Sequence, residues 1–125
     1  MKSSKIAVIL AGHGSRESGF QAPMEKVASR LRKDKRFSPV TCAYLEITSP
    51  SIGEAIDRCV AKKAREIRVL PYFVLGGRHV KTHIPEIIAK AREKHRGASK
   101  IILCPFLGFD ERLVLLAKKR ILKAK

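Results

Sequence analysis

The stretch KIAVILAG, residues 5–12, is a short apolar run rich in β-branched residues. Three similar runs follow it, and none alternates cleanly between apolar and polar residues: PVTCAYLE (39–46), EIRVLPYFVLGG (66–77) and KIILCPFLGF (100–109). Runs without alternation are typical of strands that are buried on both faces. The four runs therefore predict a parallel β-sheet.

Apolar residues between and after these runs recur at the spacing of amphipathic helices. The four helical patterns cover residues 20–31, 52–60, 84–91 and 113–121. Ser51 and Glu54 have the spacing of a capping box at the start of the second helix. The element order is then βαβαβαβα. Right-handed crossovers convert this order into a small three-layer α/β sandwich of the flavodoxin type, with a four-stranded parallel sheet.

Length and composition set the expected class of protein. The 125 residues, 45% of them hydrophobic, fit one domain over residues 1–125. Cys42, Cys59 and Cys104 are odd in number and form no C-x-x-C pair, so we expect reduced thiols and neither a disulfide framework nor a zinc ribbon. The opening MKSSKIAVILAG imitates a signal peptide, but HGSRE follows where a cleavage site should be. No apolar stretch reaches the roughly 20 residues of a membrane helix, and we expect a soluble, cytoplasmic protein with no membrane partner.

The chain is strongly basic, with 27 lysine and arginine residues against 11 aspartate and glutamate residues and a net charge of +16. Acidic residues stand where first helical turns are expected, and basic clusters stand at the helix ends, which complements the helix dipoles. The acidic residues are Glu17, Glu54, Glu86 and Glu111. The C-terminal ends of the helices lie at the edge of the sheet opposite the carboxyl ends of the strands. We therefore expect most of the positive charge to lie away from the ligand-binding edge.

Three side chains that can bind a metal follow the first three apolar runs. His13 follows the first run, Glu46 ends the second, and His79 comes after the third. Because the carboxyl ends of parallel strands share one edge of a sheet, we expect the three groups to converge there. Two imidazoles and one carboxylate suit cobalt, nickel, iron or zinc and leave coordination positions open. Open positions are typical of catalysis or metal transfer.

The same edge has candidates for binding an anionic ligand. Ser15 offers a hydroxyl group near a helix N-terminus. The basic residues expected near the edge are Arg16, Arg78, Lys81 and Arg112, and we assign them to carboxylates of the substrate.

Structural roles for these residues remain open alternatives. A histidine that follows a strand can satisfy a nearby carbonyl group, and Glu46 can form a salt bridge with Arg16 or Arg78. In both alternatives these residues stabilise the fold and neither bind a metal nor take part in catalysis.

Other motif classes have little support. His79 and His83 have the i, i+4 spacing of a zinc clamp, but Val80 stands where a zinc-protease helix has glutamate. We therefore expect His83 at a helix entry, and His95 as a solvated cap at a helix end. The loop GHGSRESG matches neither the P-loop nor the dinucleotide-binding pattern.

Three motifs in order resemble those of the sirohydrochlorin chelatase family in its small single-domain form. They are GHGSR (12–16), LEITSPSI (45–52) and PYFVLGGRHVKTHIPE (71–86), and the likeness covers nearly the whole chain. The resemblance implies the class II chelatase fold and insertion of a divalent metal, usually cobalt, into sirohydrochlorin on the route to cobalamin. Related small enzymes use nickel or iron with this polycarboxylate tetrapyrrole, and no organic cofactor is implied.

The resemblance also implies roles for individual residues. His13 and His79 match the metal-binding histidines of the family, and Glu46 matches its acidic residue after the second strand. These three groups would also exchange protons with the macrocycle, so they are the expected catalytic residues. Small members of the family pair as homodimers, which implies a homodimer here.

Two other function classes compete with a chelatase. A metal-carrying binding module would use the same three ligands without turnover. A nucleic-acid-binding protein would explain the charge, but the chain has no aromatic stacking platform, so we expect no nucleic-acid partner. Binding of the tetrapyrrole ring, and a salt-sensitive shift of DNA, discriminate among the three.

Overall fold

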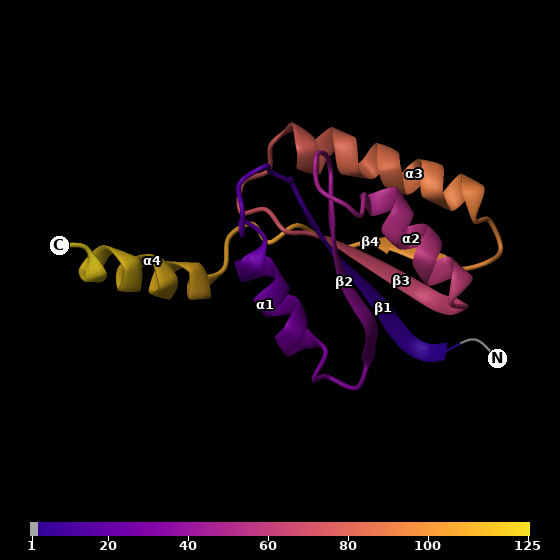
Figure 1. The fold of residues 1–125 in the computed structure, drawn as a ribbon, viewed down its shortest axis with the longest axis horizontal. Coiled ribbons are helices and arrows are strands. Elements are labelled where there is room, and N and C mark those ends of the chain that lie inside the picture. Colours follow the sequence, from indigo (N-terminus) through magenta and orange to yellow (C-terminus); the bar gives the residue numbers. More distant parts are fainter. Residues whose placement is uncertain (1–2) are drawn as a thin grey trace.

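The structure is a computed structural model that describes residues 3–125. Its four strands form one parallel sheet in the order β2-β1-β3-β4, which confirms the predicted α/β class (Figure 1). The elements in chain order are β1 (Ser3–Gly12), α1 (Ala22–Leu31), β2 (Phe37–Tyr44), α2 (Ile52–Ala61), β3 (Ala64–Pro71), η1 (His79–His83), α3 (Ile84–Lys94), β4 (Lys100–Leu103) and α4 (Glu111–Lys123).

The central strand β1 is buried on both faces, as its unbroken apolar run predicts. Ala7, Ile9 and Ala11 pack with α2 and α3 on one face of the sheet. Val8 and Leu10, which alternate with them, pack with α1 on the other face. The core is therefore divided into two apolar layers by the sheet, and every strand directs its carboxyl end to the same edge.

Helix starts agree with the sequence pattern in part. The capping box of α2 is complete, because Ser51 N–H donates to the Glu54 carboxylate at 2.8 Å and Glu54 N–H donates to Ser51 Oγ at 3.1 Å. The first helix begins only at Ala22, so Glu17 lies in the loop before α1. The expectation that Glu17 stands in a first helical turn is therefore wrong, and Glu25 is the acidic residue in that turn.

No helix within residues 3–125 has the length and apolar composition needed to cross a membrane.

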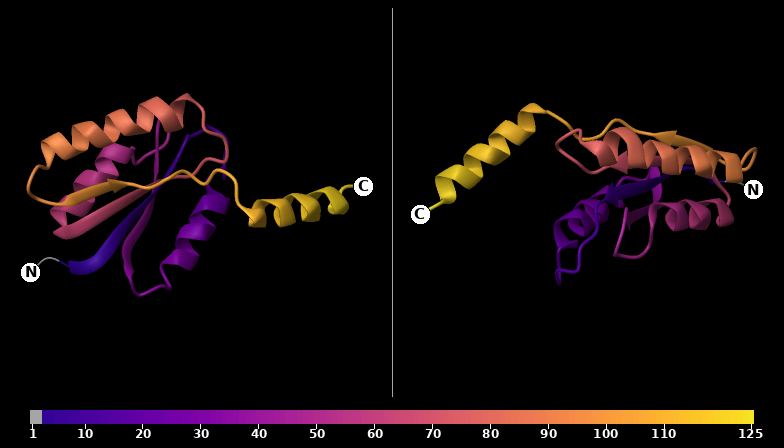
Figure 2. Two further views of the ribbon diagram at one scale, coloured as in Figure 1. Left: turned by 180° about the vertical axis from the view of Figure 1, so that it is seen from behind. Right: turned by 90° about the horizontal axis from the view of Figure 1, so that it is seen from above.

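The last helix forms where the pattern predicts it, but it does not join the sandwich. Helix α4 leaves the body of the protein and projects away from the sheet (Figures 1 and 2). None of its residues is buried, and Ile121 and Leu122 are 71% and 85% exposed. Consequently α1 alone covers its face of the sheet, whereas α2 and α3 share the other face.

Candidate functional site

The loops after β1 and β2 continue the hydrogen-bond ladder of their strands. Leu45 N–H donates to the Gly12 carbonyl at 3.0 Å, and Glu46 N–H donates to the His13 carbonyl at 3.1 Å. Hydrogen bonds between parallel strands are evenly spaced along the strands, so this continued ladder sets the distance between the backbones of His13 and Glu46. The two residues are therefore placed side by side by the sheet itself rather than by a flexible loop.

Glycine is required at position 14 for these two loops to meet. Gly14 has a φ of +104°, in a region that favours glycine, and a Cβ atom built there would lie 1.9 Å from the carbonyl oxygen of Glu46. The backbone beside His13 can approach the backbone at Glu46 only because this Cβ is absent.

We expect Gly14→Ala to lower the free energy of unfolding by at least about 2 kcal/mol, because it adds both backbone strain and a clash with backbone atoms. Gly53→Ala is the matched control: a Cβ atom at Gly53 meets nothing within 4 Å, and alanine in α2 should raise stability by up to about 1 kcal/mol. Urea unfolding of both variants measures the difference. Equal stability of Gly14→Ala and wild type would contradict the close approach.

A side-chain bridge also joins the two loops. Ser15 N–H donates to Thr48 Oγ1 at 3.2 Å, and the Thr48 hydroxyl donates to the Ser15 carbonyl at 3.2 Å. The hydroxyl of Ser15, predicted for substrate binding, accepts from Glu17 N–H at 3.0 Å and so shapes its own turn. Thr48 is a residue that the sequence reasoning missed, since nothing in its local pattern signals a cross-loop contact.

His79 lies on a wide helical turn at the start of α3. The Ile84 N–H donates to the His79 carbonyl, which closes the i to i+5 turn of a π-helix over η1. Such turns often occur at functional sites. The turn runs directly into α3, so the predicted position of His83 at a helix entry is confirmed.

The structure brings the three predicted metal-binding groups together at the carboxyl edge of the sheet. His13 Nε2 lies 3.1 Å from His79 Nε2 and 3.2 Å from Glu46 Oε1. Two ligand atoms bound to one metal at about 2.0–2.1 Å lie about 3.0–3.4 Å apart, so both separations fit edges of a coordination polyhedron. The side chains of His13 and Glu46 are 47% and 54% exposed, which leaves this cluster open to solvent.

The orientation of His13 is set by the other ring nitrogen. Its Nδ1 lies 3.2 Å from the carbonyl oxygen of Gly14, and an Nδ1 proton donated there leaves the Nε2 lone pair free for a metal. A backbone carbonyl on one ring nitrogen commonly fixes which nitrogen of a histidine is free to bind a metal. A contact of Nδ1 with a backbone carbonyl, which is the structural alternative for His13, is therefore compatible with metal binding through Nε2.

His83 contacts the same cluster, which the sequence reasoning did not assign. Its Nδ1 lies 2.9 Å from Nδ1 of His79. If His79 binds a metal through Nε2, its Nδ1 carries the proton and donates it to His83 Nδ1. The i, i+4 spacing of His79 and His83 is the sequence signal for this contact, which does not require the zinc-protease pattern.

The described residues contain no set of three side chains already arranged around a metal position. The pairwise contacts of His13 nevertheless converge on one atom, its Nε2.

Two hollows flank the cluster. One, of about 260 Å³, is lined by His13 and by the rings of Phe20, Tyr44, Tyr72 and Phe73. Burial raises the pKa of Tyr44 to about 12, so its hydroxyl stays protonated at neutral pH. The other hollow, of about 250 Å³, contains Glu46, His79, His83 and Glu86. The histidines thus stand between an aromatic surface and a polar one.

The four predicted basic residues lie in three different parts of the chain. Arg16 is exposed in the loop after β1, Arg78 precedes η1, and Lys81 is exposed within η1. Arg112 lies instead at the start of the projecting α4, where it pairs with Asp110 at 3.5 Å. His95, the fourth histidine, is the C-cap of α3 as predicted, but it is not solvated, because its side chain is only 14% exposed and pairs with Asp57 at 2.6 Å.

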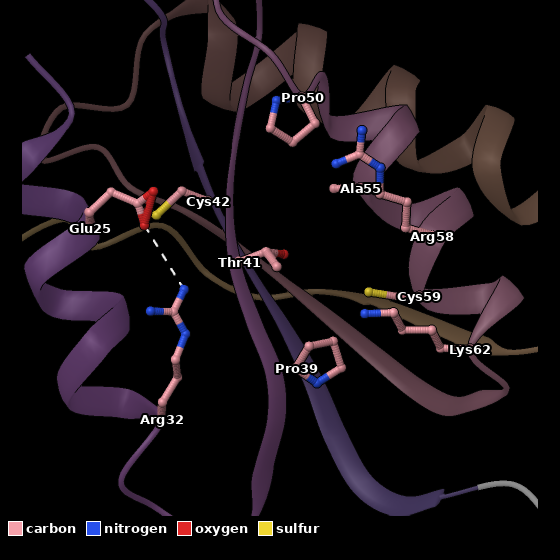
Figure 3. A pocket seen from close by; sticks show the side chains of 10 residues that line it. All are labelled: Glu25, Arg32, Pro39, Thr41, Cys42, Pro50, Ala55, Arg58, Cys59 and Lys62. Atoms are coloured by element: carbon pink, nitrogen blue, oxygen red, sulfur yellow. Dashed lines mark ion pairs between the residues drawn. The ribbon is translucent and has the colours of Figure 1, made fainter.

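A separate cavity of about 310 Å³ lies between α1 and α2 along β2 (Figure 3). It contains the thiols of Cys42 and Cys59, and burial raises the pKa of both, to about 12 for Cys42. Protonated thiols are poor metal ligands and poor nucleophiles. This cavity contains no histidine and is not the site predicted from the sequence.

Known proteins resemble this chain over most of its length. A sirohydrochlorin cobaltochelatase from Sulfolobus acidocaldarius is 32% identical over 119 residues, which cover 95% of this chain and 92% of that protein. A chloroplastic sirohydrochlorin ferrochelatase from Arabidopsis thaliana is 32% identical over 98 residues, 78% of this chain. The chain spans only 44% of the length of that protein.

Solved structures share the fold. The sirohydrochlorin chelatase SirB from Bacillus subtilis subspecies spizizenii, in complex with cobalt, superposes with a TM-score of 0.81 and 30% identity over 94% of this chain and 50% of that chain. A CbiX protein from Marinobacter aquaeolei superposes with a TM-score of 0.74 and 25% identity over 93% of both chains. The family model of CbiX matches residues 7–124. Fold, order of motifs and relatives agree, and the chain belongs to the CbiX family.

Proposed function

We propose that this chain inserts a divalent metal into sirohydrochlorin, with cobalt as the physiological metal. The observation that carries the proposal is the convergence of His13, His79 and Glu46 beside an aromatic hollow at an exposed edge. The relatives named as cobaltochelatases and ferrochelatases support the reaction class.

The reaction exchanges one metal ion for two pyrrole protons. Metal enters from solvent, because the cluster is about half exposed, and exchanges water for the Nε2 atoms of His13 and His79 and for a Glu46 oxygen. The macrocycle then lies against the aromatic hollow and takes the metal from these ligands. Each ligand that releases the metal regains a lone pair and can accept a pyrrole proton, which Glu46 can pass to water.

Recognition of the macrocycle falls to the surrounding loops. Arg16, Arg78 and Lys81 belong to the segments that carry His13 and His79 and are proposed to bind substrate carboxylates, together with Ser15. Their exposure suits a substrate whose carboxylates project from the edge of a flat ring. The proposed assembly is a homodimer, because one small edge encloses only part of such a ring.

Imidazole and carboxylate ligands bind iron, cobalt and nickel with affinity that rises in that order, so cellular supply contributes to which metal is inserted.

A cytoplasmic location is proposed from the three free cysteines.

Steady-state assays of the full chain with sirohydrochlorin and Co²⁺, Ni²⁺ or Fe²⁺, the last under anaerobic conditions, test the proposal through the absorbance change of the ring. We expect many turnovers per chain and the highest kcat/KM with Co²⁺. Transfer of at most one metal per chain would instead establish a metal carrier. Faster turnover with Fe²⁺ or Ni²⁺ would correct the metal and leave the reaction class intact.

His83 should act as a positioning residue for His79. We expect His83→Ala to weaken Co²⁺ binding by roughly 10-fold or more, because loss of a hydrogen-bond partner to a metal-binding imidazole has effects of this size. His83→Asn keeps an acceptor near the position of Nδ1 and should restore most of the affinity. Competition with a coloured chelator measures both; equal loss in the two variants would mean that the imidazole of His83 itself binds the metal.

A further inference from the structure

The cavity between α1 and α2 lies along β2, which is an edge strand of the sheet (Figure 3). Its volume of about 310 Å³ is at the lower end of the range for small-molecule sites. The side chains that line it come mainly from α1, β2 and α2, and the proposed reaction uses none of them. The cavity is therefore a candidate for a second, separate ligand.

Positive charge exceeds negative charge around this cavity. The charged residues that line it are Glu25, Arg32, Arg58 and Lys62, so three cations and one carboxylate leave an excess of two positive charges. The two thiols in the cavity add no negative charge at neutral pH, because burial raises the pKa of each. A ligand with two negative charges would balance the lining.

The acidic side chains nearest in sequence to Arg58 already have other partners. Glu54 accepts a hydrogen bond in the capping box of α2, and Asp57 pairs with two basic side chains at the end of α3. Within residues 3–125, neither Arg58 nor Lys62 forms an ion pair with a carboxylate. Figure 3 shows both side chains extending from α2 towards β2. Two cations are thus available to an anion in the cavity.

Arg32 is held in place on the α1 side of the cavity. Its Nε and Nη2 atoms donate to the Val40 carbonyl at 3.0 and 2.8 Å, whereas its ion pair with Glu25 is long, at 4.0 Å. These bonds occupy a carbonyl group of the edge strand, so a peptide that added to β2 as a further strand would have to displace Arg32. A compact anion requires no displacement, because Nη1 of Arg32 still carries two N–H groups.

A hydroxyl group at this cavity has no partner. Thr41 Oγ1 is the one buried side-chain polar atom within residues 3–125 that forms no hydrogen bond. An unpaired buried hydroxyl destabilises the fold, so a ligand that supplies an acceptor is favoured. A turn about χ1 exchanges the positions of the hydroxyl and methyl groups of threonine, and it can present the hydroxyl to the cavity that this side chain lines.

We propose that this cavity binds a compact dianion, whose charge is carried by one phosphate group or by two carboxylates. Arg58 and Lys62 form ion pairs with it, Thr41 donates a hydrogen bond, and Arg32 faces it from α1. The site goes beyond the proposed function and does not rest on it. A ligand that binds only the folded chain also stabilises that chain against unfolding.

Calorimetric titration of the full chain tests the site without metal or tetrapyrrole. The probes are inorganic phosphate and succinate, at a pH where both are dianions and at an ionic strength held constant with chloride. We expect one dianion per chain, and the tighter probe identifies the charged group. Arg58→Gln should weaken binding by roughly 10-fold or more, because loss of a charged hydrogen-bond partner has effects of this size. Arg65→Gln is the matched control, since Arg65 is exposed and does not line the cavity.

Thr41→Val separates ligand binding from a purely structural role. It removes the unpaired hydroxyl, so it should raise the melting temperature of the ligand-free chain and reduce the further rise that the dianion produces. The proposal is overturned if neither probe binds more tightly than chloride, or if Arg58→Gln binds both probes as the wild type does. It is also overturned if Arg16→Gln abolishes binding and Arg58→Gln does not, since the anion would then lie in the loop after β1.

Discussion

Replacing His13 by alanine should lower metal insertion by a factor on the order of 10³ while the protein stays folded. Its Nε2 is the atom at which both other candidate ligands meet, at 3.1 Å from His79 and 3.2 Å from Glu46. The variant therefore loses a metal ligand and a proton acceptor together. His79→Ala should have a similar effect for the same reason.

The measurement is single-turnover and steady-state conversion of sirohydrochlorin with Co²⁺, paired with thermal unfolding. His95→Ala is the control: it also removes a histidine, but from the pair with Asp57 at the far end of α3. It should keep wild-type turnover. Wild-type turnover in His13→Ala would remove this residue from the mechanism.

Glu46→Gln should lower turnover by roughly 100-fold or more and stability by less than about 1 kcal/mol. The glutamine keeps the shape and one hydrogen-bond acceptor but lacks the negative charge that binds a metal or carries a proton. Its pairing with His13 is half exposed, so the charge contributes little to folding. Glu46 therefore separates chemistry from structure better than either histidine does.

Glu86→Gln is the matched control for Glu46, because both carboxylates border the hollow that contains His79 and His83. We expect its turnover to remain near that of the wild type. A Glu46→Gln protein with an unchanged rate constant and a lower melting temperature would assign Glu46 a structural role and leave a two-histidine mechanism.

Much of the site could be predicted from the sequence because parallel strands end at one edge. The apolar runs locate the strand ends, and strand order then brings His13, Glu46 and His79 together without any knowledge of side-chain packing. The capping box at Ser51 is equally local, and it was confirmed.

The remainder depends on contacts that have no local signal. The need for glycine at position 14 comes from the carbonyl of Glu46, which is distant in sequence. The hydrogen bonds of Thr48 and His83 depend on how two loops and one turn approach each other. The apolar pattern of α4 predicts a helix correctly, but it does not predict that this helix leaves the sandwich.

The wide turn at η1 also bears on how such a site can arise. A π turn holds one residue more than an α turn, so deleting one residue between His79 and α3 would rotate everything before it by about 100° about the helix axis. His79 would then leave the neighbourhood of His13, although both the histidine and the helix would remain in the gene. Insertion or loss of a single codon at the start of α3 is thus sufficient to create or abolish this meeting of two imidazoles, without a change in any other residue.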